Sequence, residues 1–260
     1  MSDKLSIDLA SGALHDGLAE IAEEASMLIL PYWRSGAEVF TKADDSPVTL
    51  ADQAAETLIL TRLAALYPDV QAVAEEQSEA HGKPDRAADR FWLIDPLDGT
   101  KGFIAGKESF TVNIALIEGS RPIAGVVSAP ATATTWRTGP GGGAQMRRFG
   151  EAWRSIQVRD RSEGRVALLS HGVSDEEAPR LCSRHGCTDW QGMDSSIKFC
   201  LIAEGRFDAY PRTGPTMEWD TAAGQAVLEA AGGRVLGPDG APLAYGKPGF
   251  RNGAFVAMGG

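Results

Sequence analysis

The chain has 260 residues, 43% of them hydrophobic, which is enough for one large core or two closely packed lobes. Its net charge of −10 argues against a general binder of nucleic-acid polymers, because such proteins present a basic face to the phosphate backbone. No apolar run approaches the roughly 20 residues that cross a bilayer, and the N-terminus lacks a signal-peptide pattern, so we expect neither a transmembrane segment nor export.

The number and spacing of the cysteines indicate the cellular compartment of the protein. Cys182, Cys187 and Cys200 are an odd set without CxxC spacing, so we expect neither a disulfide framework nor a thiolate zinc site. A reducing cytosol fits best, and the prediction is therefore a cytoplasmic protein. Attachment to the periphery of the inner membrane and the choice between monomer and homodimer stay open.

Two helices are predicted first. Apolar residues recur at helical spacing over residues 14–32, and a second helical pattern follows Thr49, a candidate N-cap, and ends near Tyr67. Short β-like runs come next, at residues 71–74, 91–94, 110–118 and 121–128. The last two runs are joined by a turn at residues 118–120, which is typical of an antiparallel meander.

The second half begins with a glycine cluster at residues 139–143. No strand-to-helix signal surrounds it, so we interpret it as a hairpin tip or lobe boundary and not as a phosphate loop. Further along we expect a strand at 166–170, a helix near 195–204, a strand at 207–210 and a last helix at 220–231. Asp220 is a candidate N-cap of that last helix, and Gly232 and Gly233 supply its stop. Such alternating blocks favour a layered α+β fold.

Asp95 and Asp98 carry the clearest chemical signal. They follow an apolar run that should be a buried strand, so both carboxylates leave its end together. Mg²⁺ prefers oxygen ligands, and the carbonyl of Leu97 can add another. Gly99 permits close backbone approach, and Thr100 can open a helical turn whose N–H groups face a phosphate. Taken alone, such an Asp-Pro-x-Asp-Gly segment is more often only a turn.

Three separated motifs, in this order, resemble the inositol monophosphatase superfamily. They are Glu75-Glu76, Asp95-Pro96-Leu97-Asp98-Gly99-Thr100 after an apolar strand, and the run 218–224. The segments 42–49, 99–103, 110–116 and 195–205 narrow the resemblance to the 3′(2′),5′-bisphosphate nucleotidases of the CysQ type. The resemblance covers residues 42–233. By themselves, Glu75 and Glu76 could equally be solvated charges and Asp220 a simple helix cap.

The resemblance implies a fold and a metal centre. The expected fold is a layered αβαβα sandwich of the inositol monophosphatase type. In it, residues 1–130 form an N-terminal lobe that carries the metal centre, and residues 131–260 complete one continuous catalytic unit. The metal ligands implied for two or three Mg²⁺ ions are Glu75, Asp95, Leu97, Asp98 and Asp220. The catalytic residues implied are Asp52, Glu75 and Thr100, of which Thr100 paired with Asp52 positions and deprotonates the attacking water.

Substrate specificity is inferred from a different region. Inositol phosphatases place a glutamate after the strand that here contains Tyr210, whereas this sequence has Arg212, which suits a second phosphate or a base. The substrate-binding residues that the resemblance implies are Glu75, Leu97, Asp98, Gly99, Thr100, His171, Ser196, Lys198, Arg212 and Asp220. From the spacing alone, Lys198 and Arg212 could equally be surface cations, and His171 a structural residue.

The function implied is that of a magnesium-dependent, lithium-sensitive phosphomonoesterase of sulfur metabolism. It would hydrolyse the 3′-phosphate of adenosine 3′,5′-bisphosphate, a small-molecule substrate, to AMP and phosphate. Two alternatives remain. One is an inositol-1-phosphate phosphatase, or an enzyme with both activities, and the other is a nucleotide-binding protein that has kept the fold without catalysis.

Overall fold

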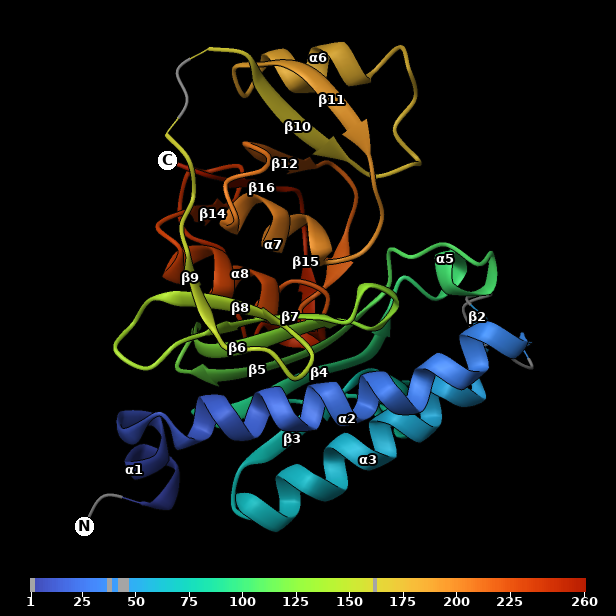
Figure 1. The fold of residues 1–260 in the computed structure, drawn as a ribbon, viewed down its shortest axis with the longest axis vertical. Helices are drawn as coiled ribbons and strands as arrows, with labels where there is room; N and C mark the ends of the chain where they lie inside the picture. The colour runs from blue at the N-terminus through green and yellow to red at the C-terminus, as the bar shows by residue number, and fades with distance from the viewer. Residues whose placement is uncertain (1–2, 37–38, 42–46, 161–162) are drawn as a thin grey trace.

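The computed structural model describes residues 3–36, 39–41, 47–160 and 163–260. Its elements are stacked in five layers, helix, sheet, helix, sheet and helix, as Figure 1 shows. The predicted αβαβα sandwich is therefore confirmed.

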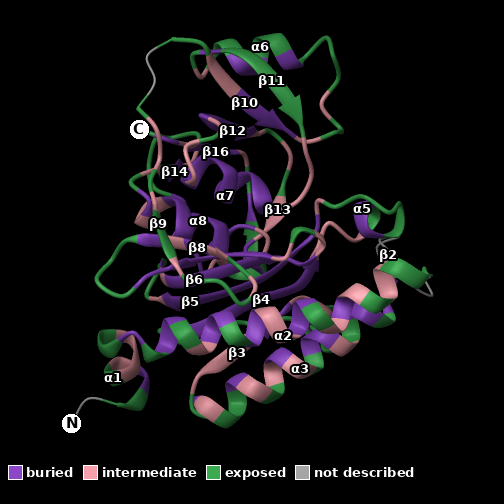
Figure 2. Cartoon of the chain, viewed as in Figure 1, coloured by how far each residue is buried: buried purple, intermediate pink, exposed green. Residues whose placement is uncertain are grey.

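The first layer is a pair of long helices, α2 (Ala13–Ser35) and α3 (Leu50–Leu66). Both bury the side that faces the first sheet, and their outer sides are exposed (Figure 2). Thr49 is the N-cap of α3, as predicted, and it forms a capping box with Asp52, whose side chain accepts the backbone N–H of Thr49 at 2.8 Å. The short α1 (Lys4–Ser11), which was not predicted, buries only Leu5.

The second layer is a seven-stranded sheet. In spatial order its strands are β3 (Gln71–Ala74), β4 (Arg90–Asp98), β5 (Thr111–Glu118), β6 (Arg121–Ala129), β7 (Thr134–Thr138), β8 (Ala144–Arg148) and β9 (Arg154–Ile156). β3 runs parallel to β4, and every later pair is antiparallel, which confirms the predicted meander. The glycine cluster forms the hairpin tip between β7 and β8, where the N–H of Gly139 donates to the carbonyl of Gly143 at 2.6 Å.

β4 is buried on both faces. Phe91 and Leu93 belong to the core on the side of the middle helices, whereas Trp92 and Ile94 belong to the core under α2 and α3. A strand covered on both sides needs an apolar residue at every position, which explains the continuous apolar run in the sequence.

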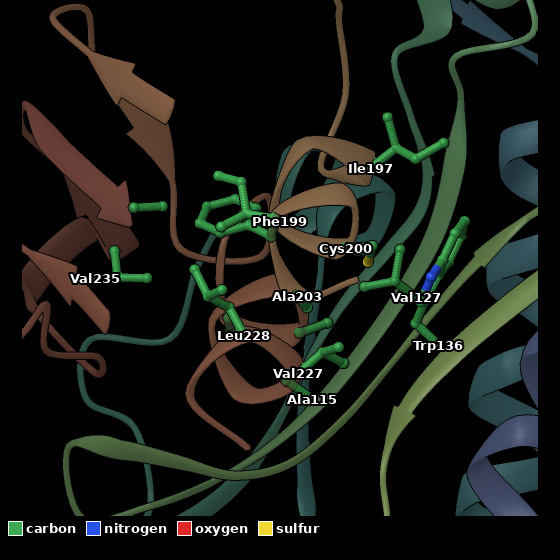
Figure 3. Packing of buried hydrophobic residues seen from close by; sticks show 14 of the residues in the cluster. Ala115, Val127, Trp136, Ile197, Phe199, Cys200, Ala203, Val227, Leu228 and Val235 are labelled. Atoms are coloured by element: carbon green, nitrogen blue, oxygen red, sulfur yellow. The ribbon is translucent and has the colours of Figure 1, made fainter. Parts of the chain in front are cut away.

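The middle layer consists of α7 (Ile197–Ala203) and α8 (Ala222–Ala230). Phe199 and Leu228 face Val235 in the second sheet, whereas Cys200 lies on the side of Val127 in the first (Figure 3). The two helices approach so closely that a Cβ on Gly224 would lie 2.5 Å from the Phe199 ring. At the end of α8, Gly232 has a φ of +94° and the N–H of Gly233 bonds to the carbonyl of Leu228, so the predicted stop is confirmed.

The N-cap prediction for Asp220 is wrong. Thr221 occupies the N-cap position, and α8 starts at Ala222. The carboxylate of Asp220 turns back instead and accepts the N–H of Met217 at 2.8 Å. The side chain of Asp220 lines a cavity, so a role as helix cap does not explain why an aspartate is present at this position.

The fourth and fifth layers complete the sandwich. The second sheet contains, in spatial order, β11 (Cys187–Gly192), β10 (Arg165–Leu169), β12 (Ala209–Arg212), β16 (Phe255–Met258) and β14 (Arg234–Leu236). α6 (Ala178–Ser183) packs on its outer face. Two short pairs lie outside both sheets, β1 (Val39–Thr41) with β2 (Pro47–Thr49) and β13 (Thr216–Met217) with β15 (Arg251–Asn252).

The first sheet continues past residue 130, because β7, β8 and β9 pair next to β6. The chain changes sheets between β9 and β10, and both sheets pack on the α7 and α8 layer. The division into lobes at residues 130 and 131 stays a prediction. The three cysteines are free and buried. Within the described ranges, no helix combines the length and the apolarity that a membrane span requires.

Candidate active site

The acidic turn predicted from the sequence lies at the carboxyl end of β4. Asp95 pairs with Asn113 and Asp98 with Thr111, so the register with β5 shifts by one residue between them. Such a bulge re-aims the side chains at the end of a strand. The carboxylate of Asp95 accepts the N–H of Leu97 at 3.0 Å and closes the turn.

Gly99 joins this turn to the short helix α5 (Thr100–Ile104). Its φ of +94° is left-handed, and a Cβ would lie 2.9 Å from the carbonyl oxygen of Ser109. Only glycine satisfies both conditions without strain. The predicted helical turn that Thr100 opens is therefore confirmed.

The other predicted metal ligands come to the same place. Glu75 is the first residue of α4 (Glu75–His81), directly after β3, and β3 is the parallel neighbour of β4. Asp220 reaches the site from the loop before α8. One cavity of about 440 Å³ is lined by Glu75, Asp95, Leu97, Asp98, Gly99, Thr100, Lys101, Gly102, Asp194, Ser195 and Asp220. The structure thus brings together all five residues that were predicted as metal ligands.

The electrostatics of the cavity favour a bound cation. Burial raises the pKa of Asp95 well above its usual range, and repulsion from Glu75, Asp98 and Asp220 adds to this effect. Burial, followed by repulsion from Asp98 and Glu75, likewise raises the pKa of Asp220. A divalent cation would relieve this repulsion.

The donors fit Mg²⁺, which takes carboxylate and carbonyl oxygens. In the described part of the chain, however, no group of three or more acidic, histidine or cysteine side chains has the geometry to hold an ion as it stands. The assignment of individual ligands and the number of ions therefore remain predictions.

Thr100 and Asp52 form the pair that the sequence predicted. The hydroxyl of Thr100 lies 3.2 Å from Oδ1 of Asp52 and 3.0 Å from the carbonyl oxygen of Leu97. Oδ2 of Asp52 accepts both the N–H and the hydroxyl of Thr49, at 2.8 and 2.7 Å. Because Thr49 holds Oδ2 of Asp52, the other oxygen, Oδ1, is fixed in a position that faces Thr100.

A second, smaller cavity of about 110 Å³ adjoins the first. It shares Asp98, Asp194, Ser195 and Asp220 with the acidic cavity, and its further lining includes Ser196, Lys198 and Arg212. Lys198 is only 2% exposed, so it is not a surface cation. The smaller cavity, which contains Lys198 and Arg212 beside three carboxylates, therefore shares a wall with the acidic cavity.

The two cations are held by protein oxygens. Nζ of Lys198 donates to the carbonyl of Ser195 at 2.6 Å and lies 4.6 Å from the centre of the Tyr210 ring. Burial lowers the pKa of Lys198 to about 8, although Asp98 and Asp194 oppose this shift. The guanidinium of Arg212 donates to the hydroxyl of Ser170 at 2.8 Å and to the carbonyl of Gly214 at 3.3 Å, which fixes its direction.

Ser196 lies in the lining of the smaller cavity, whereas His171 lies at the rim of the site. The N–H of Ser196 donates to the carboxylate of Asp98, and its hydroxyl bonds to Asn113 at 2.7 Å, so Ser196 helps to hold Asp98 in place. His171 is 48% exposed and outside the lining of both cavities. Its Nδ1 lies 2.9 Å from the carboxylate of Asp194, which places it at the rim. Contacts of either residue with a substrate stay predictions.

Several residues of the site were not predicted. Asp194 lines both cavities, contacts Nδ1 of His171 at 2.9 Å and forms an ion pair with Lys107. Ser195 has a positive φ of +68°, uncommon for a residue with a side chain, and lies against Gly99. The signal that could have revealed both is the short polar run Asp194-Ser195-Ser196 at the start of the predicted helix at 195–204. Residues 42–46, part of the resemblance, lie outside the described residues.

A layered α+β fold with a cavity of clustered carboxylates fits a metal-dependent phosphatase. Residues 14–257 match the inositol monophosphatase family. The chain belongs to this family, whose members generally depend on Mg²⁺.

Individual relatives agree with this assignment. The chain is 39% identical to the 3′(2′),5′-bisphosphate nucleotidase CysQ of Escherichia coli K12 over 91% of this chain and 98% of the relative. Among solved structures, CysQ from Bacteroides thetaiotaomicron is 32% identical with a TM-score of 0.77, over 94% of this chain and 96% of that one. An inositol monophosphatase from Anabaena is 28% identical with a TM-score of 0.75, over 95% and 91%.

Proposed function

We propose that this chain is a Mg²⁺-dependent 3′(2′),5′-bisphosphate nucleotidase that converts adenosine 3′,5′-bisphosphate to AMP and phosphate. The observation that carries the proposal is the shared wall between the acidic cavity and the cavity that contains Lys198 and Arg212. A substrate with two phosphates needs two such sites, one for hydrolysis and one for anchoring. The curated CysQ relatives support the same substrate class.

The acidic cavity would receive the 3′-phosphate. Its metal ligands would be Glu75, Asp95, the carbonyl of Leu97, Asp98 and Asp220. Bound Mg²⁺ supplies positive charge to the phosphate oxygens and Lewis acidity to the site. The repulsion among these carboxylates supports this role, because a bound cation is what would allow them all to ionise.

Thr100 and Asp52 would orient and deprotonate the attacking water. The Thr100 hydroxyl donates its proton toward Oδ1 of Asp52, so an oxygen lone pair is available to accept a hydrogen bond from water. As the water attacks phosphorus in line, its proton moves to Oγ1 of Thr100 and the Thr100 proton moves to Asp52. The bond between phosphorus and the 3′-oxygen breaks, its electron pair stays on the 3′-oxygen, and that oxygen takes a proton from a solvent water to become the 3′-hydroxyl of AMP. No covalent enzyme intermediate forms.

Lys198 and Arg212 in the smaller cavity would hold the 5′-phosphate. Lys198 provides a buried positive charge, and Arg212, fixed by Ser170, offers a planar fork of donors that matches phosphate oxygens. His171, held at the rim by Asp194, would contact the nucleoside. Lithium is expected to inhibit the enzyme, as is typical of the family.

A comparison of substrates tests the proposal. Adenosine 3′,5′-bisphosphate and 3′-AMP share the scissile phosphate, but only the first has a 5′-phosphate for Lys198 and Arg212. We expect kcat/KM at saturating Mg²⁺ to be at least about 100-fold higher for the bisphosphate, because two charge-assisted hydrogen bonds contribute about 3 kcal/mol or more. Arg212→Glu should remove most of this difference.

Inositol 1-phosphate serves as the competing substrate. Clear preference for it over the bisphosphate would replace the proposal with the inositol phosphatase alternative. Equal losses for both substrates in Arg212→Glu would reject the specificity role of Arg212. If the purified protein with Mg²⁺ bound a nucleotide but released no phosphate from any candidate, the chain would be a binding protein.

A further inference from the structure

Helix α3 carries two buried carboxylates on one face. Asp52 and Glu56 are four residues apart, so they lie one above the other, and they are 1% and 5% exposed. Asp52 contacts Thr100, as described above. Glu56 has no part in the mechanism derived above, yet a buried carboxylate persists only where hydrogen bonds or charges compensate it.

Two partners of Glu56 lie at the start of α4. Its Oε2 accepts the backbone N–H of Glu76 at 2.8 Å, and its Oε1 accepts the N–H of Gln77 at 2.7 Å. The first N–H groups of a helix have no partner within the helix. Ala74, the residue at the N-cap position, supplies no side-chain hydrogen bond. The carboxylate of Glu56, which belongs to α3, therefore caps the N-terminus of α4.

The residue between this cap and β3 is Glu75, whose side chain lines the acidic cavity. The two hydrogen bonds fix the peptide groups directly after Glu75, while β3 fixes the backbone before it. Rotation of this first turn would move the Glu75 carboxylate relative to Asp95 and Asp98.

We propose that Glu56 is a positioning residue, which locks the first turn of α4 and so holds Glu75 in the geometry that binds the metal. This inference rests on the proposed role of Glu75 as a metal ligand. α3 then contributes two residues to the site: Asp52 contacts Thr100, and Glu56 holds the turn that carries Glu75. Groups that orient ligands in this way typically change metal affinity 10- to 100-fold when they are replaced.

Two variants test the inference. Glu56→Ala removes both acceptor oxygens, whereas Glu56→Gln keeps the shape of the side chain and one acceptor oxygen. If Glu56→Ala does not fold, Glu56→Gln still tests the inference. Binding of Mn²⁺, which favours the same oxygen ligands as Mg²⁺, is measured without substrate from the EPR signal of the free ion. Hydrogen exchange at the amides of Glu76 and Gln77 is measured by NMR.

We expect Glu56→Ala to weaken Mn²⁺ binding at least 10-fold and to speed exchange at both amides, with a smaller effect of Glu56→Gln. The kcat of both variants should return to within about 3-fold of wild type at saturating Mg²⁺. The control is Asp208→Asn. Asp208 is equally buried and accepts the N–H of Val166 at 2.7 Å, but it lines neither cavity. The Asp208→Asn variant should be less stable than wild type but should bind Mn²⁺ with the same affinity.

Three outcomes would overturn the inference. Faster amide exchange with unchanged Mn²⁺ affinity would mean that Glu56 only caps α4. Equal loss of Mn²⁺ affinity in Asp208→Asn would mean that general destabilisation explains the effect. Unchanged exchange in both Glu56 variants would mean that the cap does not hold this turn. Absence of Mn²⁺ binding in the wild-type protein would instead reject the proposed function, so the two failures are distinguishable.

Discussion

Lys198 would connect the stability of the protein with its affinity for the proposed substrate. Burial lowers its pKa from 10.5 to about 8, so keeping the charged form in the folded state costs about 3 kcal/mol. The full cost applies below pH 8, where the lysine is protonated in both folded and unfolded states. As pH rises from 8 to 10.5 the unfolded state binds more protons, so the cost disappears and stability from this group increases.

The first prediction is that Lys198→Met makes the protein more stable and a poorer enzyme. At pH 7 the free energy of unfolding, measured with urea, should rise by about 1–2 kcal/mol, less than the full cost because the carbonyl of Ser195 loses its donor. The KM for the bisphosphate should rise at least about 10-fold, the loss of one charge-assisted contact. A fall in stability would show that the charge of Lys198 is well compensated in the folded protein.

The second prediction concerns pH. In the wild-type protein kcat/KM for the bisphosphate should decline above about pH 8, as Lys198 loses its proton and its charge. The kcat/KM for 3′-AMP, which has no 5′-phosphate, should not show this decline. The Lys198→Met variant is the control, since its kcat/KM for the bisphosphate should be low and flat over the same range. A decline shared by both substrates would assign the titration to another group.

The third prediction is for Thr100. Thr100→Ala removes the hydroxyl that contacts Asp52, and it should lower kcat about 100- to 1,000-fold, the usual contribution of a positioned proton acceptor. Thr100→Ser keeps the hydroxyl and should stay within about 10-fold of wild type. The Mg²⁺ concentration for half-maximal activity should change little in either variant. Similar kcat values for the Ala and Ser variants would exclude proton transfer through Thr100.

At the scale of elements, the turn after β4 depends on one glycine, which gives the fourth prediction. Gly99→Ala should lower the free energy of unfolding by about 2–3 kcal/mol and also lower kcat, because the left-handed φ and the contact with Ser109 act together. The matched control is Gly141→Ala. Gly141 also has a positive φ, +82°, but nothing lies within 4 Å of its Cβ position. That variant should lose only about 1 kcal/mol and keep full activity.

Elements with a strong period could be predicted from the sequence, and elements held by distant neighbours could not. α2 and α3 show a helical stripe, and β4 shows the apolar run of a strand buried on both faces. β7 and β8 contain Arg137, Gln145 and other polar residues, so their pattern is weak, and they exist because they pair with β6 and with each other.

The same limit applies to the site. The motifs around Glu75, Asp95 and Asp220 lie around one cavity, because a strand end and its neighbours carry these residues. Glu56 and Asp194 were missed, since their partners lie 20 or more residues away and nothing in the local sequence shows the contact. The candidate N-cap Asp220 proved to lie one residue before the true cap, Thr221, because the choice between adjacent cap residues depends on a turn that the sequence does not reveal.

At the scale of the whole molecule, the acidic cavity joins the layers. Asp95 and Asp98 come from the first sheet, Asp220 from the loop that enters the middle helices, and Asp194 follows the second sheet. Carboxylates drawn together from several layers repel each other, and the net charge of −10 adds to this repulsion. A cation that binds them would therefore stabilise the contacts between layers as well as the site.

The last prediction follows from this coupling. Mg²⁺ without substrate, at ten times its Kd, should stabilise the folded protein by about 1.4 kcal/mol, because it binds only the folded state. For a chain of this length the melting temperature should rise by roughly 3–5 °C, measured by calorimetry against KCl of the same ionic strength.

The matched variant for this measurement is Asp95→Asn, which keeps the shape but removes the central charge. Without metal it should be at least as stable as wild type, since the burial and the repulsion that raise the pKa of Asp95 no longer act on a charge. With Mg²⁺ it should show little increase in melting temperature and no metal-dependent turnover. An increase equal to that of wild type would mean that the stabilising ion binds elsewhere, and that the layers are not joined through this cavity.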